Sequence, residues 1–197
     1  MTRVIAAIAG AGALAVLFSG CASTPSHLYT LSAVAAATPN PDPGLSKLVI
    51  VIGPVSIPAI VDVPQIVVHT GPNQVSLNEF NRWASPLGTN ITQVVTSNLT
   101  TLLGTSRVSS ALSMDADYRV SIDVQTFESA PGDAATLSAL WTVRRVKDGK
   151  TESGRSTDRE AVSQKSFETL AAAHSRALVH LSADIADAIR TLDHASQ

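Results

Sequence analysis

The sequence has few charged residues, few aromatic residues and a single cysteine. Of its 197 residues, 15% are charged and 4% are aromatic, and 14 Lys and Arg stand against 16 Asp and Glu. A nucleic-acid-binding protein needs a clustered basic excess to neutralise phosphates, so we expect no nucleic-acid partner. One cysteine excludes an internal disulfide framework and a multi-cysteine metal site. The hydrophobic content of 45% excludes a disordered chain and is enough to form a core.

No apolar run in the sequence is long enough to span a membrane comfortably. The uncharged apolar stretch Val4–Phe18 has about 15 residues, whereas a transmembrane helix needs roughly 20. Arg3 precedes this stretch, and the small residues Ser19 and Gly20 follow it. This order of positive charge, apolar run and small residues is typical of a secretory signal peptide. We therefore expect residues 1–20 to be a signal peptide and the mature protein to be exported.

The only cysteine, Cys21, directly follows this segment and resembles the lipid-attachment cysteine of a bacterial lipobox. The residue three positions before that cysteine is usually Leu, and Phe18 stands there in this chain. Several acyl chains, such as palmitate, would anchor the protein durably, whereas a single chain gives only marginal binding. The alternative is an ordinary signal peptide that leaves a thiol near the cleavage point. Ala22 lacks the acidic side chain that favours inner-membrane retention, so we expect a lipidated, outer-membrane terminus with a tether at 21–27.

The rest of the chain predicts one α/β domain over residues 28–193, followed by a tail at 194–197. Short β-branched runs, period-two alternation and turn signals indicate strands, and a 3.6-residue apolar period indicates two long amphipathic helices. The expected strands cover 28–31, 48–52, 65–69, 74–80, 118–125, 137–146 and 151–160, and the expected helices cover 86–103 and 166–192. We expect a mixed, mostly antiparallel sheet of five to six strands packed with the two helices.

Local signals predict how several of these elements begin and end. Ser85 is expected to cap the first helix, with Pro86 at its first helical position and Gly104 just beyond its end. Thr and Asn side chains are expected to fill the face opposite the apolar stripe of this helix. Asp148 and Gly149 are expected to form a type I′ hairpin turn, in which both residues have positive φ. The strand that follows is polar and is expected at an edge of the sheet.

No constellation of catalytic or metal-ligating residues emerges from the sequence. His174 lies on the apolar stripe of the second helix and is expected in the core. His180 does not share its face, because six residues turn a helix by about 240°. Arg144 and Arg145 are expected on opposite faces of a strand, so they do not form a joint anion site. No nucleophile, base and oxyanion donor come together, so we expect no enzyme, no cofactor and no metal site.

Two stretches carry a family resemblance. Residues 52–68 read Ile-Gly-Pro-Val-Ser-Ile-Pro-Ala-Ile-Val-Asp-Val-Pro-Gln-Ile-Val-Val, and residues 82–87 read Arg-Trp-Ala-Ser-Pro-Leu before the first helix. Together with Cys21 and the early Leu28-Tyr-Thr-Leu31, they resemble the ABC-type transport auxiliary lipoproteins. These are the lipoprotein components of MCE (mammalian cell entry) lipid-transport systems, including the paraquat-inducible protein C type. The family usually has a basic or large polar residue after the Val-Asp step, where this chain has Val63.

The resemblance implies an outer-membrane lipoprotein whose domain faces the periplasm. Its partners would be an ABC transporter and a membrane-tethered MCE protein that carry lipid between membranes, and the membrane itself through the N-terminal lipid. Subunits that dock on a ring-forming partner could also form a homo-oligomer, for which the residues give no sign.

The apolar segment from Pro54 to Pro64 is the predicted docking surface. Gly53-Pro54 is expected to end the preceding strand, and Pro58 and Pro64 prevent a regular central strand because proline donates no backbone hydrogen bond. Exposed apolar segments mark interaction surfaces, and tryptophan is a common interface anchor. The expected partner-binding residues are Ile57, Pro58, Ile60, Val61, Asp62 and Trp83. The alternative is that these apolar side chains pack under a loop and that Trp83 belongs to the core.

Two other functional classes stay open from the sequence alone. One is a stand-alone envelope lipoprotein that binds a small hydrophobic ligand, and the other is a secreted hydrolase. Adjacent permease, ATPase and MCE genes would favour the transport function over both.

Overall fold

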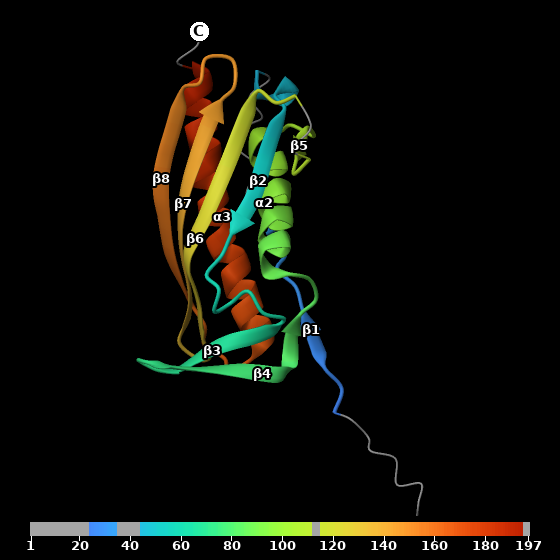
Figure 1. Ribbon diagram of the computed structural model, residues 1–197, viewed down its shortest axis with the longest axis vertical. Coiled ribbons are helices and arrows are strands. Elements are labelled where there is room, and N and C mark those ends of the chain that lie inside the picture. The colour runs from blue at the N-terminus through green and yellow to red at the C-terminus, as the bar shows by residue number, and fades with distance from the viewer. Residues whose placement is uncertain (1–23, 35–43, 112–114, 195–197) are drawn as a thin grey trace, which may run out of the picture.

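The computed structural model describes residues 24–34, 44–111 and 115–194. The predicted signal peptide, the predicted lipidation residue Cys21 and residues 195–197 lie outside this part of the chain. The described residues form eight strands, two long helices and one short 3-10 helix (Figure 1). The strands are β1 (His27–Tyr29), β2 (Ile50–Ser56), β3 (Gln65–Gly71), β4 (Gln74–Trp83), β5 (Val108–Ser109), β6 (Tyr118–Ala130), β7 (Ala134–Arg145) and β8 (Thr151–Ala161), and the helices are η2 (Leu45–Lys47), α2 (Leu87–Leu103) and α3 (Phe167–His194).

Five strands form a mixed sheet in the order β5-β2-β6-β7-β8. β2 runs parallel to β5 and β6, whereas β6, β7 and β8 are connected as antiparallel hairpins. Both long helices pack on one face of this sheet, with α3 along β7 and β8 and α2 beside β2 (Figure 1). The predicted fold class, a mixed α/β domain with two long amphipathic helices, is therefore confirmed.

Alternation along β6 divides its side chains between the core and the solvent. Val120, Ile122 and Val124 are buried on the helix side, whereas Ser121 and Asp123 are exposed on the other side. Period-two alternation has this effect because successive side chains of a strand point to opposite faces. The predicted strand is confirmed here and continues as far as Ala130, and β8 forms an edge of the sheet as expected.

Three strands form a second sheet, which the sequence did not separate from the first. Its order is β1-β4-β3, with β3 and β4 paired as the predicted hairpin and β1 parallel to the end of β4. Residues 57–64 turn the chain between β2 and β3, so the hairpin crosses one end of the larger sheet instead of joining it (Figure 1). α3 ends at the opposite end of the molecule, where β7 also ends.

The expected end of β2 at Gly53-Pro54 is wrong, because the strand continues to Ser56. The pairing with β6 shifts register between Ile52 and Val55, so Pro54 lies at a bulge. A bulge tolerates proline because the bulged residue makes no regular ladder hydrogen bond. A Cβ added at Gly53 would lie 3.3 Å from the Val120 carbonyl oxygen, so glycine permits a close approach of the two strands there.

The expected cap of α2 is also wrong. The N-cap position is Pro86, whose backbone is extended with ψ 131°, and no side chain caps the helix. The first helical hydrogen bond runs from the Asn90 amide to the Pro86 carbonyl at 3.0 Å, so the helix begins one residue later than predicted. The expected end is confirmed, since Gly104 adopts the left-handed conformation with φ 65°.

Two further local expectations fail for identifiable reasons. Asp148 does not have positive φ, so the hairpin turn is not type I′; instead the Gly149 amide donates to the Arg145 carbonyl across a longer loop. Asn90 and Asn98 of α2 are buried instead of exposed. Their amides donate hydrogen bonds to the hydroxyls of Thr30 and Ser182, each at 3.2 Å, which offsets part of the cost of burying them, while Asn98 Oδ1 has no partner.

Candidate docking surface

The predicted docking segment, Pro54–Pro64, consists of the end of β2 and a tightly turned loop, residues 57–64, between the two sheets. The Val61 amide donates to the Pro58 carbonyl at 3.0 Å, and the Asp62 amide donates to the Ala59 carbonyl at 3.3 Å. The Pro64 carbonyl in turn accepts a hydrogen bond from the Trp83 amide at 2.8 Å. The prolines therefore supply acceptors where they cannot donate, and the Pro64 end of the loop is hydrogen-bonded to the end of β4.

The predicted partner-binding residues divide between the core and the surface. Val61 and Trp83 belong to the hydrophobic core, and the Trp83 indole meets the Phe127 ring edge-on, with 6.2 Å between the ring centroids. Ile57 and Pro58 are half-buried, whereas Ile60 is 56% exposed and Asp62 is exposed. The buried members hold the loop in place, and Ile60 and Asp62 face solvent.

Two shallow hollows flank this loop, and Asp62 and Pro86 line both of them. Their volumes are about 450 Å³ and about 370 Å³. The larger is lined by Pro54, Val55, Ser56, Ile57, Asp62, Pro86, Gly88, Thr89 and Thr92, and the smaller by Asp62, Val63, Pro64, Trp83, Ala84, Ser85, Pro86 and Leu87. The structure thus brings the docking segment together with the start of α2.

Gly88 contributes to this surface and was missed in the sequence. A Cβ added there would lie 3.2 Å from the Val55 carbonyl oxygen, so the absence of a side chain at residue 88 lets the first turn of α2 lie close against β2. Thr92 lies one turn further on, and its hydroxyl donates to the Gly88 carbonyl at 2.8 Å. A glycine in the first turn of a helix, where it lowers helix propensity, was the available signal of a close contact.

The family model for the ABC-type transport auxiliary lipoprotein component matches residues 29–186, which include the docking segment and every strand from β2 to β8. The chain belongs to this family. A crystal structure of an uncharacterized protein superposes with a TM-score of 0.70 at 18% identity, covering 84% of this chain and 99% of the other. Protein XCC0632 from Xanthomonas campestris, of the family DUF330, gives 0.70 at 20% identity, covering 87% and 100%. At these identities the likeness shows the fold, and no match is found among curated proteins.

Membership of the auxiliary lipoprotein family places the protein in the cell envelope and connects it with transport. In the part of the chain that the structure describes, no helix is long and apolar enough to cross a membrane.

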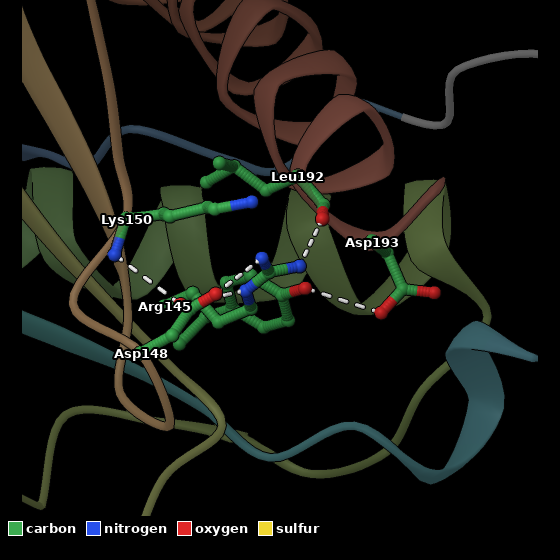
Figure 2. Close-up of polar contacts among 6 residues, drawn as sticks. Arg145, Asp148, Lys150, Leu192 and Asp193 are labelled. Atoms are coloured by element: carbon green, nitrogen blue, oxygen red, sulfur yellow. Dashed lines mark hydrogen bonds and ion pairs between the residues drawn. The ribbon is translucent and has the colours of Figure 1, made fainter. Parts of the chain in front are cut away.

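A buried arginine connects the end of α3 to the turn between β7 and β8 in this auxiliary lipoprotein (Figure 2). Arg145 is 3% exposed, and its guanidinium donates to both oxygens of the Asp148 carboxylate, at 3.0 and 2.6 Å. It also donates to the Leu192 carbonyl in the last turn of α3. The hydrogen bond from Arg145 lowers the pKa of Asp148 to about 2, so this carboxyl is ionised at neutral pH.

Tyr118 completes this polar cluster from the start of β6. Its hydroxyl donates to the Asp193 carboxylate at 3.1 Å. Burial, with the negative charge of Asp193 as the next cause, raises the pKa of Tyr118 to about 12. A positive side chain near the last carbonyls of a helix also complements the helix dipole. The cluster therefore stabilises the end of α3 against the sheet, far from the docking segment.

His174 lies in the core, as the sequence predicted, and is fully buried. Its Nε2 shares a hydrogen bond with the Ser129 hydroxyl at 2.9 Å, and its ring stacks on Phe127 with 3.7 Å between centroids. Nδ1 has no hydrogen-bond partner. Burial lowers the pKa of His174 to about 3, so the imidazole is neutral under ordinary conditions.

Three potential metal ligands meet between β8 and α3, where residues distant in sequence come together. Asp158, Glu160 and His180 place one ligand atom each within 4.8 Å of one another. His180 Nδ1 lies 3.3 Å from an Asp158 oxygen, and Arg176 Nε lies 2.5 Å from a Glu160 oxygen. The arginine opposes cation binding by repulsion, and its ion pair with Glu160, together with the contact between His180 and Asp158, connects helix and strand.

A larger hollow of about 590 Å³ lies between β1 and the first half of α3. It mixes apolar and polar side chains and is lined by Leu28, Tyr29, Thr30, Ser32, Val34, Glu168, Ala171, Ala172, Ser175 and Arg176.

Proposed function

We propose that the protein is anchored in the outer membrane by acyl chains on Cys21, with its domain in the periplasm. We further propose that it acts as an auxiliary component of an MCE lipid-transport system by docking onto the MCE protein and its ABC transporter. Family membership and the position of Cys21 after an apolar signal segment support this assignment. Family membership also favours it over a stand-alone lipoprotein that binds a small ligand.

The observation that carries the proposal is the fixed, outward presentation of Ile60 and Asp62. Ile60 is 56% exposed on a loop whose backbone is hydrogen-bonded and whose neighbours Val61 and Trp83 are buried, which favours an ordered loop before any partner binds. Association is less costly when the binding segment is ordered in advance. The hollows on both sides of Asp62 can receive partner side chains, which is how interface anchors gain most of their energy.

The protein is proposed to act by binding and not by catalysis. The hydrogen-bonded serine and histidine that most resemble a catalytic pair, Ser129 and His174, are both buried. A nucleophile and its base must reach a substrate, so this pair is better explained as part of the core.

Co-purification with a tagged MCE protein from detergent-solubilised membranes tests the docking proposal. Ile60→Asp should keep the melting temperature of the wild type, because the side chain is mostly exposed, and should lose about 30-fold in affinity, the loss typical of a hot-spot residue. The matched control is Val146→Asp, which changes an apolar residue that is 41% exposed at the opposite end of the molecule. If both variants bind equally well, or the wild type does not co-purify, the docking proposal fails.

A further inference from the structure

The three-stranded sheet exposes several large apolar side chains. Leu28 of β1 is 65% exposed, and Leu77 and Phe80 of β4 are 47% and 46% exposed. Strand side chains of this size are normally buried, and apolar surface left in water marks a place where another apolar surface binds. These three residues are called the basal apolar residues below.

The strand register places two of the basal apolar residues on the side of the sheet that faces away from the core. Tyr29 pairs with Trp83, and both rings pack inward, against aromatic rings of α3 and β6. Leu28 pairs with Arg82, one position along the strands, so these two side chains point outward. The pairing of β4 with β3 shifts register between Asn78 and Arg82, so Phe80 lies in an irregular stretch of the strand. Arg82 pairs with Gln65 and Leu77 with Val67. Gln65 and Val67 lie on one side of β3, so Leu77 shares the outward side of Arg82.

The length of the tether limits which surface can lie opposite this sheet. Six residues lead from Cys21 to His27 at the start of β1, and they span at most about 20 Å even when fully extended. The helix α3 has 28 residues and is therefore about 42 Å long, so its far end lies well beyond that reach. If Cys21 is acylated, the three-stranded sheet is the part of the domain held closest to the lipid.

We propose that the basal apolar residues form a membrane-contact surface that rests on the bilayer in which Cys21 is anchored. The inference rests on the acylation of Cys21 in the proposed function. Apolar side chains gain free energy by entering the boundary between headgroups and acyl chains. Arg82 on the same side carries a positive charge, which complements anionic lipid headgroups. The five-stranded sheet then stands away from the membrane, and residues 57–64 lie between the two sheets (Figure 1).

Tryptophan fluorescence in reconstituted vesicles tests this contact surface. The full acylated chain, carrying either Phe80→Trp or the control Val146→Trp, is placed in vesicles of phosphatidylethanolamine, phosphatidylglycerol and brominated phosphatidylcholine. The emission that Phe80→Trp adds to that of the wild type should shift to the blue and be quenched by bromine. The emission added by Val146→Trp should stay unshifted and unquenched, because this residue lies at the far end of the molecule. Leu77→Trp replaces Phe80→Trp if circular dichroism shows that the latter does not fold.

Flotation of the same vesicles separates this inference from the proposed function. In one outcome, the protein floats with the vesicles while the tryptophan at position 80 or 77 is quenched no more than the tryptophan at position 146. In that case the proposed membrane-contact surface is wrong, and the acylation of Cys21 is still supported. That outcome would also be expected if a partner protein covers the basal apolar residues. If the protein does not float and mass spectrometry finds no acyl group on Cys21, the anchor and the contact surface both fail.

Discussion

At the scale of single residues, His174 illustrates how burial changes the chemistry of a polar side chain in this protein. Its ring is stacked on Phe127 and hydrogen-bonded to Ser129 on one nitrogen only. A neutral imidazole is stable in such a site, whereas an imidazolium would be buried there without solvent or a counter-charge, which costs free energy. The folded protein therefore holds His174 neutral down to a pKa of about 3, while the unfolded chain protonates it near pH 6.5.

Acid should destabilise the protein through this residue. As pH falls below 6.5 the unfolded chain binds a proton at His174 that the folded protein does not, so the free energy of unfolding falls by up to about 1.4 kcal/mol per pH unit until the folded pKa is reached. Urea denaturation at several pH values between 6.5 and 5 measures this slope. His174→Phe keeps a stacking ring without a titrating group, and its slope should be shallower. Equal slopes for the two proteins would mean that another group causes the acid sensitivity.

At the scale of elements, two neighbouring arginines show that position on a strand decides what a charge does. Arg144 is exposed on the outer face of β7, whereas Arg145 is buried on the helix side and bonded to Asp148 and Leu192. The sequence predicted their opposite orientation, because side chains alternate along a strand. It did not predict the partners of Arg145, which come from a turn and from the end of a helix 47 residues away.

Replacing these two arginines should therefore have unequal effects. Arg145→Ala removes charged hydrogen bonds to the turn and to α3, and should lower the free energy of unfolding by about 1.5–3 kcal/mol. Arg144→Ala changes an exposed residue and should stay within about 0.5 kcal/mol of the wild type. Chemical denaturation with the same denaturant measures both. A loss of unfolding free energy in Arg145→Ala that is as small as the loss in Arg144→Ala would show that the polar cluster at the end of α3 adds little to stability.

The other predictions for single helices and turns succeeded where residues next to each other in sequence decide the structure. The hairpin of β3 and β4 and the end of α2 at Gly104 were predicted, since turn residues and left-handed glycine act locally. The predicted cap at Ser85 was wrong because Pro86 has an extended backbone and is itself the N-cap residue. The helix therefore begins at Leu87, one residue later than predicted. The turn prediction at Asp148 failed because the backbone of this residue does not adopt positive φ, and its side chain binds Arg145.

At the scale of the whole molecule, the sequence predicted the fold class but not the division into two sheets. That division depends on strand pairing between segments such as β1 and β4, which lie more than 50 residues apart and carry no local signal of their register. Within the docking segment, the prolines indicated a loop. The sequence could not tell that Val61 and Trp83 are buried while Ile60 and Asp62 face solvent, because the burial of Trp83 depends on Phe127 in a distant strand.

Site-specific photo-crosslinking in living cells tests the central claim, that the loop around Ile60 contacts the MCE protein, most directly. A photo-reactive amino acid in place of Ile60 changes a mostly exposed side chain, and the same amino acid in place of Val146 is the control for a similarly exposed position at the other end of the molecule. We predict an ultraviolet-dependent covalent adduct with the MCE protein from position 60 and none from position 146. An adduct from position 146 alone, or no adduct from position 60 in cells where the lipoprotein and the MCE protein are both present, would contradict this account.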